Sequence, residues 1–320
     1  MKPFNVFPYD SNVNFIRLRW VSLAIAALMA LVSIGSIATK GFNFALDFTG
    51  GIGVELRYAK PVDVDFVRNK LESAGYSNPV VQNFGTGTEL LIRLQSKEGQ
   101  GQAGDATTSI AQDIKTLTST PDNQATVLNS AVVSPQVGKD LALNGIWAVI
   151  FVVVGFLIYI SFRFEKKFAI AAVATTMFVV LAVLGWFSIA GREFDLALLA
   201  GVLSVMGYSI NDTIVVFDRV RENFRSMRFD AETILNKSIN QTLSRTVITS
   251  FVAFLTVLAL YLYGGSSLEG MAESQMIGIV IATLSSIFVA CPLLTIGFLK
   301  VTKQDLMPKA KDEEALARRP

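Results

Sequence analysis

Histidine is absent from the 320 residues of this sequence, and cysteine occurs only once. The lack of histidine excludes Ser-His-Asp and Cys-His catalysis, the common zinc sites and proton relays built on imidazole. Cys291 has no second cysteine to pair with, so it is interpreted as a small apolar side chain. These absences predict a protein that is not an enzyme and that binds no cofactor and no metal.

Charged residues are also scarce, at 17% of the chain, whereas hydrophobic residues make up 52%. This composition is typical of an integral membrane protein. Six apolar runs are each close to the roughly 20 residues that a helix needs to cross a bilayer. The predicted spans cover residues 20–38, 145–162, 168–190, 196–217, 247–263 and 276–299.

Lysine and arginine are distributed unevenly among the connections between the spans. They gather before the first span, between the second and third, between the fourth and fifth, and after the sixth, from Lys2 onward. The opposite short connections hold only Arg192. Because basic connections stay in the cytoplasm, both termini are predicted to be cytoplasmic. The net charge of +2 follows from this topology and does not indicate nucleic acid binding.

Two features of the predicted cytoplasmic side leave alternatives open. The first span follows Arg17 and Arg19 and could be a cleaved signal peptide. Its long apolar run, and the even number of spans that it completes, favour a retained anchor. The six basic residues between Asp218 and Val247 predict a cytoplasmic amphipathic helix. This helix would either touch anionic membrane lipids or dock partner proteins.

The long polar segment, residues 40–142, is predicted to fold as a periplasmic α+β domain. Residues 52–58 alternate as in a half-buried strand, and Asp63 can cap a helix that ends at Gly75. Strands at 80–84 and 90–94, joined by Gly85-Thr86-Gly87, precede a loop over 99–105, a helix around 110–117 and a strand at 125–133. This β-α-β-β-α-β order predicts a ferredoxin-like fold. Because the segment has no cysteine, histidine or phosphate loop, we expect a binding or lever domain without chemistry.

The predicted fold is therefore a polytopic α-helical membrane protein with six transmembrane helices and an α+β domain between helices 1 and 2. Its parts are a cytoplasmic N-terminus (1–19), a first transmembrane helix (20–39), the periplasmic domain (40–142), a five-helix transmembrane domain (143–299) and a cytoplasmic tail (300–320).

One acidic residue, Asp212, falls inside the fourth span. It lies five residues before the end of the span, which places its carboxyl about 8 Å inside the hydrocarbon edge. An ionised carboxylate at this depth costs on the order of 3 kcal/mol, so it needs a partner, a water path or a proton. Asp212 is accordingly a candidate for proton handling. The alternative is a hydrogen-bond anchor between helices, with Tyr208 or Asn211 nearby.

Several stretches resemble SecF, the smaller half of the SecD–SecF protein-export membrane protein. They are GFNFALDFTGG (41–51), VVSPQVGKDLA (132–142), FRFE (162–165), GYSINDTIVVFDRVREN (207–223) and SINQTLSRTVITS (238–250). The resemblance implies one half of a resistance-nodulation-division-type transporter in the bacterial cytoplasmic membrane. It also implies a SecD partner, with the SecYEG translocon, YajC and exported preproteins as further associates. In this family the proton-motive force moves the external domains and so promotes late steps of protein export.

The resemblance also assigns roles to individual residues. The family's essential fourth-helix aspartate falls on Asp212, and its arginine near the start of the fifth helix falls on Arg245. Two positions depart from the family. Where it commonly has His-Asp in the third helix, this chain has Phe178 and Val179, and Ser244 replaces the histidine before the arginine. A proton route through those groups is therefore absent or runs elsewhere, for example through the partner.

The fourth span also has a predicted polar stripe, because Ser204, Tyr208 and Asp212 follow each other at intervals of four residues. Gly201 and Gly207 would let another helix approach closely. We expect the stripe to face SecD across a wetted crevice, where burial favours the neutral acid and Arg245 favours the ionised one. Two other functions remain possible for these residues: half of a proton-driven exporter of small molecules or lipids, and a non-transporting translocon assembly factor.

Overall fold

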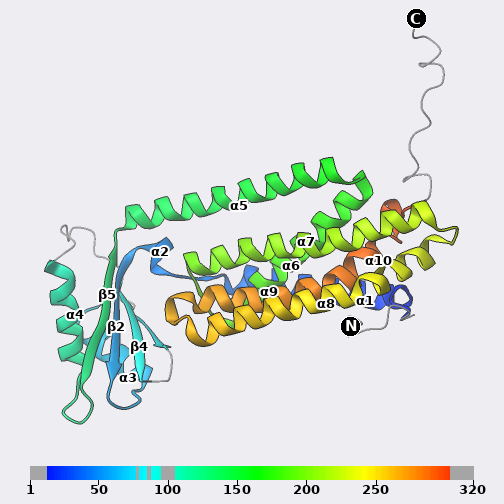
Figure 1. The fold of residues 1–320 in the computed structure, drawn as a ribbon. Helices are drawn as coiled ribbons and strands as arrows, with labels where there is room; N and C mark the ends of the chain where they lie inside the picture. The colour runs from blue at the N-terminus through cyan, green and yellow to red at the C-terminus, as the bar shows by residue number, and fades with distance from the viewer. Residues whose placement is uncertain (1–12, 77–78, 85–87, 95–104, 303–320) are drawn as a thin grey trace, which may run out of the picture. The chain divides into compact units, whose positions relative to one another are not determined.

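The structure is a computed structural model that describes residues 13–76, 79–84, 88–94 and 105–302 (Figure 1). Some predicted features lie outside these residues: Lys2, the turn Gly85-Thr86-Gly87, most of the 99–105 loop and the tail beyond Thr302. The chain forms two compact units. The transmembrane unit comprises Met1–Phe42, Ile150–Arg192 and Ala200–Pro320, and the α+β unit comprises Asn43–Val149 and Glu193–Leu199.

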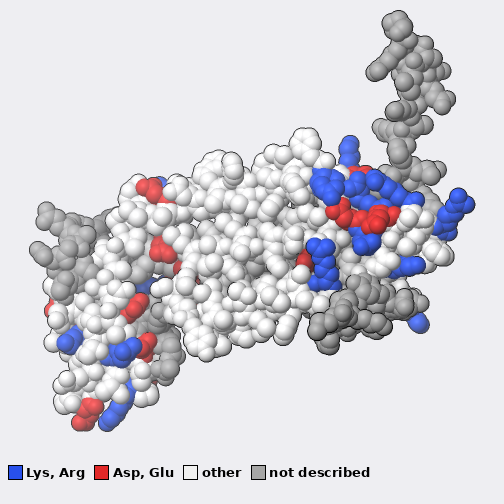
Figure 2. All heavy atoms as spheres, viewed as in Figure 1, with Lys and Arg blue, Asp and Glu red and all other residues white. Residues whose placement is uncertain are grey.

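Six helices of the described chain are long and apolar enough to cross a membrane, which confirms the predicted fold class. They are α1 (Arg19–Lys40), α5 (Pro135–Arg163), α6 (Lys166–Ala190), α7 (Leu196–Ser226), α8 (Ala231–Tyr263) and α9 (Glu269–Ser285). Figure 2 shows the result on the visible face of the transmembrane unit, where a broad band lacks charged residues and basic residues gather at one end. We call this the basic end; Arg163 and Arg221 belong to it.

The sixth span differs from its predicted limits of 276–299. Helix α9 begins earlier, at Glu269, and continues through a π-helical turn (Ser286–Ala290) into the short helix α10 (Cys291–Leu293). The chain then turns back, so that the N–H of Val301 donates to the carbonyl of Leu294 at 3.0 Å. The predicted end was wrong because the apolar run continues through this turn, where Gly297 has a positive φ of 54°.

The predicted amphipathic helix between the fourth and fifth spans is not a separate element. Helix α7 runs on to Ser226 and α8 starts at Ala231, so only four residues connect them. Asp230 caps α8 by accepting a hydrogen bond from the N–H of Thr233 at 3.1 Å. Hydrogen bonds from Thr233 hold the pKa of Asp230 below its usual value. Arg228 lies in this connection, and the other five basic residues of the region lie on the two spanning helices α7 and α8.

Small residues set the close approaches between helices of the transmembrane unit. A Cβ on Gly185 of α6 would collide with Ser33 of α1, and one on Gly278 of α9 would collide with Val205 of α7. Within a bilayer, small residues of this kind allow backbones to pack closely. Contacts of α1 with α6, α6 with α9, and α8 with α9 hold the unit together.

The α+β unit contains a four-stranded antiparallel sheet in the order β3-β4-β2-β5. Its elements are β2 (Gly51–Tyr58), α3 (Val64–Ser73), β3 (Val80–Phe84), β4 (Glu89–Leu94), α4 (Asp105–Thr118) and β5 (Ala125–Val133). Apolar side chains of both helices, such as Leu71 and Ile114, are buried with Leu56 and Ile92 of the sheet. The element order and the strand order together confirm the predicted ferredoxin-like topology.

Three short elements were not predicted. Strands β1 (Asn43–Phe44) and β6 (Glu193–Phe194) form a parallel pair, and the one-turn helix α2 (Leu46–Thr49) follows β1. All three belong to the α+β unit. They connect the segment after α1 to the segment just before α7, so they bear directly on the helix that carries Asp212.

Candidate functional site

Asp212 is buried inside the transmembrane unit, with 3% of its surface exposed. Its partner is the hydroxyl of Ser250 on α8, which lies 3.5 Å from Oδ2. The Ser250 oxygen is itself the meeting point of two other hydroxyls, from Tyr208 of α7 and Thr283 of α9, each at 2.7 Å. Three helices thus contribute to one polar cluster, which we call the hydroxyl cluster.

The hydroxyl cluster surrounds a carboxyl group with neutral hydrogen-bonding partners. A hydroxyl can donate to an ionised carboxylate or accept from a protonated one, so the cluster can accommodate both charge states. Two more hydroxyls, those of Ser209 and Thr246, are buried without a partner among the described residues. Thr246 precedes Ser250 by one turn on α8. Because buried hydroxyls ordinarily have partners, these atoms are suited to hold water near Asp212.

Arg245 does not form a direct ion pair with Asp212. The Arg245 side chain is exposed, and within the described part of the chain its guanidinium has no hydrogen bond or ion pair. In the structure, the Asp212 carboxyl and the Arg245 guanidinium are therefore separated and do not form an ion pair.

The structure divides the remaining predicted residues between two faces of α7. Tyr208 lies with Asp212 on the face toward α8, whereas Ser204, Gly207 and Asn211 are exposed. Their spacing of three and four residues places these three on a common face. The predicted stripe is thus two stripes, because Ser204 does not share the surroundings of Asp212.

The two predicted glycines also differ. A Cβ on Gly201 would collide with the Ser274 hydroxyl and lie 2.8 Å from the carbonyl oxygen of Met271, so α9 approaches α7 closely at this point. Apart from its two chain neighbours and the nearby backbone of α7, no atom of the described chain lies within 4 Å of the Cβ position of Gly207. Gly201 therefore serves packing within the chain, and Gly207 leaves room on the exposed face.

Ser250 and Thr283 were not predicted as site residues. Ser250 closes the SINQTLSRTVITS stretch, but nothing in the pattern distinguishes its hydroxyl from those of its neighbours. Thr283 lies on another helix, and its approach to Ser250 depends on how α9 packs against α8. Both hydroxyls also donate to their own helix, to the carbonyls of Thr246 and Ile279 at 2.7 Å.

The basic end of α7 has a different kind of network, made of direct ion pairs. Arg163 pairs with Asp218 at 2.6 Å, and Arg221 pairs with Glu165 at 3.0 Å. Both guanidinium groups also lie over the ring of Phe164, at 5.2 and 5.4 Å from its centroid. Through these contacts, the FRFE stretch joins the connection between α5 and α6 to α7.

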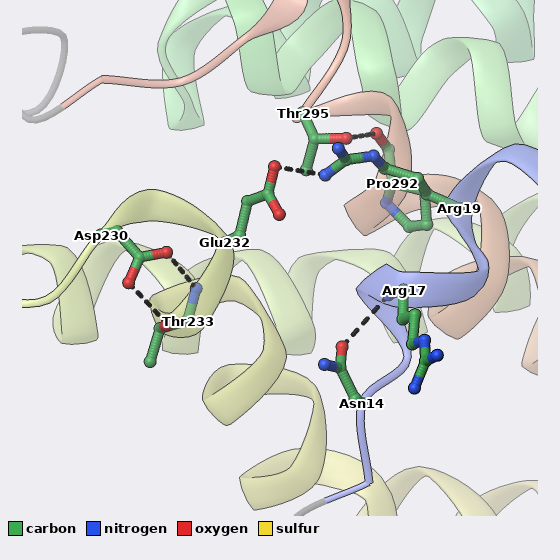
Figure 3. Close-up of polar contacts among 8 residues, drawn as sticks. All are labelled: Asn14, Arg17, Arg19, Asp230, Glu232, Thr233, Pro292 and Thr295. Atoms are coloured by element: carbon green, nitrogen blue, oxygen red, sulfur yellow. Dashed lines mark hydrogen bonds and ion pairs between the residues drawn. The ribbon is translucent and has the colours of Figure 1, made fainter.

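The segment before α1 is fixed to α8 near the same end. The N–H groups of Val13 and Phe15 donate to the side chains of Asn240 and Asn236, at 3.1 and 2.8 Å. Arg19 forms an ion pair with Glu232, close to the Asp230 cap of α8 (Figure 3). The described residues contain no cluster of acids and cysteine suited to a metal ion.

Comparison with known proteins relates the whole arrangement to protein export. Residues 113–298 match the family described as "Protein export membrane protein SecD/SecF, C-terminal", and residues 35–62 match "SecD/SecF GG Motif". The protein translocase subunit SecF of Pseudomonas aeruginosa is 40% identical over 94% of this chain and 96% of its own length. That of Escherichia coli O157:H7 is 38% identical over 96% of this chain and 94% of its own length.

Solved structures give the same relationship. The crystal structure of SecDF, a translocon-associated membrane protein from Thermus thermophilus, matches 91% of this chain with a TM-score of 0.81 and 35% identity. A SecDF structure in the super-membrane-facing form matches 92% with a TM-score of 0.66. The chain spans 39% of the first SecDF chain and 40% of the second.

Proposed function

Because this chain belongs to the SecF family of Sec-pathway protein translocase subunits, we propose that it uses the proton-motive force, together with SecD, to promote late steps of protein export. The family makes it a multi-pass protein of the bacterial inner membrane. The observation that supports proton use is the burial of Asp212 among hydroxyls, without a direct cationic partner in the described chain.

Asp212 changes its charge state as a proton passes. Burial favours the neutral acid, because an ionised carboxylate loses its hydration, and the separated Arg245 favours the ionised form. The hydroxyls of Tyr208, Ser250 and Thr283 reorient to follow the change. A route built this way needs no histidine, and neither Phe178 nor Val179 can contribute a titratable group.

The free energy available is enough to bias a helix rearrangement. A proton that moves down a potential of about 100 mV releases roughly 2.3 kcal/mol. This amount shifts a two-state equilibrium about fifty-fold, since each 1.4 kcal/mol is worth about a factor of ten. Ser250 of α8 contacts Asp212, and Thr283 of α9 contacts Ser250, so a change in the charge of Asp212 reaches three helices through this chain of hydroxyls.

The exposed face of α7 is where we place the SecD partner. Ser204, Gly207 and Asn211 expose polar or small groups within the apolar part of α7. Such groups in a membrane span usually face another helix or water, and a small residue permits close approach. The SecDF chain, of which this one spans about two fifths, contains the additional length that a second half requires.

Orientation and further partners follow from the same proposal. The basic end lies in the cytoplasm with both termini, and the domain of residues 40–142 lies in the periplasm. We expect the SecYEG translocon, YajC and exported preproteins as further associates, and contacts of the basic end with anionic lipids. The remaining boundaries, 1–19, 20–39, 143–299 and 300–320, follow from this topology.

The test is the Asp212→Asn variant, assembled with SecD and the translocon in membrane vesicles. Asparagine keeps the size and hydrogen bonding of the side chain but cannot titrate, so proton-gradient-dependent release of an exported protein should fall at least tenfold. Asp218→Asn is the matched control, because it removes a carboxylate from the same helix but outside the hydroxyl cluster. Normal gradient-dependent release by Asp212→Asn vesicles would refute the proposal.

A second candidate function is supported by one departure from the family. With Phe178 and Val179 in place of His-Asp, the chain could steady the translocon as an assembly factor without passing protons. Proton flux through the reconstituted complex separates the two functions. The flux depends on Asp212 in a proton-driven subunit and is unaffected by Asp212→Asn in an assembly factor.

A further inference from the structure

The first turn of α7 is capped by two carboxylates. Asp195, the residue just before the helix, accepts a hydrogen bond from the N–H of Leu198 at 2.6 Å. Asp47 accepts one from the N–H of Leu196 at 3.2 Å, although it lies 149 residues earlier in the chain. The first N–H groups of a helix have no partners within it, and the helix dipole favours negative charge there. Asp47 thus supplies to α7 a cap that comes from the DFTGG stretch.

Backbone pairing and aromatic packing hold the same region. Strand β1 pairs with β6 in parallel, and the N–H of Ala45 donates to the carbonyl of Phe194 at 2.9 Å. The Phe194 ring lies 5.7 Å from that of Phe44 and 5.8 Å from that of Phe48. The residues just before α7 are therefore ordered by the segment that leads into the domain.

An ion pair between a buried arginine and a partly buried glutamate connects the sheet itself to this region. Arg93 of β4, with 7% of its side chain exposed, lies 3.2 Å from Oε1 of Glu193 in β6 and donates to the carbonyl of Phe44 at 3.0 Å. Burial raises the pKa of Glu193, and Arg93 opposes this effect. Both contacts come from the single nitrogen Nη1, so one guanidinium connects β4 to β6 and to Phe44 of β1.

Glycines attach α2, which carries Asp47, closely to the sheet. A Cβ on Gly53 would lie 2.5 Å from the Leu46 side chain, and one on Gly51 would lie 2.5 Å from the carbonyl oxygen of Leu94. A Cβ on Gly138 of α5 would lie 2.9 Å from the nitrogen of Gly50. Gly51 and Gly53 thus leave room for Leu46 against β2, which holds α2, the helix that carries Asp47, close to the sheet.

We propose that Asp47, Arg93 and Glu193 are positioning residues that form a joint between the α+β domain and the outer end of the Asp212 helix. This inference rests on the proposed function. Residues Glu193–Leu199 belong to the same compact unit as the domain, while the rest of α7 belongs to the transmembrane unit. A change at Asp212 that displaces α7 therefore also displaces the first turn of α7, which belongs to the α+β unit. The joint then makes the α+β domain move with that turn.

The experiment measures proton flux and release of an exported protein in the same reconstituted complex. Asp47→Ala removes the cap, and we expect proton flux within twofold of the wild-type value while release falls at least fivefold. Asp47→Asn is the matched control, because asparagine caps helices as well as aspartate does. It should restore release to within twofold of wild type.

A second pair of variants tests the ion pair independently of folding losses. Arg93→Glu and Glu193→Arg should each uncouple flux from release, and the double exchange should recover at least part of the release. Wild-type release by Asp47→Ala, or a parallel fall of flux and release, would overturn the joint. Asp212→Asn separates the two hypotheses. If Asp212→Asn loses flux and release while Asp47→Ala keeps both, only the joint is refuted. If Asp212→Asn keeps flux and release, the proposed proton step and the joint are both refuted.

Discussion

The two faces of α7 carry similar residues in opposite surroundings. Gly201 and Asp212 face neighbouring helices of the same chain, and both are buried there. Gly207 and Asn211 have the same small and polar character, yet they are exposed. Residue type alone therefore does not show what a polar transmembrane position does. The inward face packs against α8 and α9 of this chain, whereas the outward face is the one on which we propose that SecD binds.

The largest expected effect is a difference in protein stability between variants of Gly201 and Gly207. Gly201→Val would force side-chain atoms into Ser274 and Met271, so we expect the free energy of unfolding to fall by about 1–3 kcal/mol. Thermal unfolding of the purified subunit in detergent measures this change.

Gly207→Val is the matched control for that experiment. No described atom outside α7 lies within 4 Å of the Cβ position, so stability of the isolated subunit should stay within about 0.5 kcal/mol of wild type. Its association with SecD should weaken, because the valine occupies the surface proposed for the partner helix. Equal destabilisation by both valines would show that the two faces are not different.

The next effect concerns the hydroxyl cluster on the inward face. Ser250→Ala removes the hydrogen bond to Asp212 and the meeting point of Tyr208 and Thr283. A hydrogen bond to a charged group is worth about 1.5 kcal/mol or more, which corresponds to about a tenfold slower gradient-driven release. The rate of release from vesicles is the measurement.

Thr249→Ala serves as its control, because this neighbouring hydroxyl is exposed and bonds only to carbonyls of its own helix. Release by the Thr249 variant should remain near the wild-type rate. If both variants slow release equally, the cluster has no special part in the proton step and the effect comes from α8 as a whole.

The smallest effect is expected on the outward face. Asn211→Leu removes a polar group that could bond to a partner helix, a contribution of about 0.6 kcal/mol on average. We therefore expect about threefold weaker association with SecD, measured by titration in mild detergent, and an unchanged unfolding temperature of the isolated subunit. Tighter association would indicate that the outward face meets lipid instead.

The sequence predicted the fold well wherever the signal was local. The lengths of the apolar runs revealed six spans, and alternation with turn residues revealed the ferredoxin-like sheet. The sequence did not predict that α7 and α8 continue as helices beyond their spans, because a helix outside the bilayer has no long apolar run. Strands of two residues, such as β1 and β6, are too short for any periodic pattern.

The candidate site was predicted less completely. Asp212 was evident because a carboxylate within an apolar run is expensive and rare. Ser250 and Thr283 were not, since hydroxyls in membrane helices commonly bond to their own backbone, as these two also do. Arg93 and Glu193 lie 100 residues apart in sequence, and only the pairing of β1 with β6 brings them together.

The helical hairpin of α7 and α8 has a mechanical consequence. With 31 and 33 residues, the two helices are about 46 and 50 Å long, whereas the hydrocarbon core is about 30 Å thick. A rigid rod of this length amplifies small rotations: a tilt of about 10° about its outer end displaces its opposite tip by about 8 Å. A displacement of that size can be measured at the four-residue connection, which lies outside the bilayer. Spectroscopic labels on that connection would therefore follow the movement of α7 in real time.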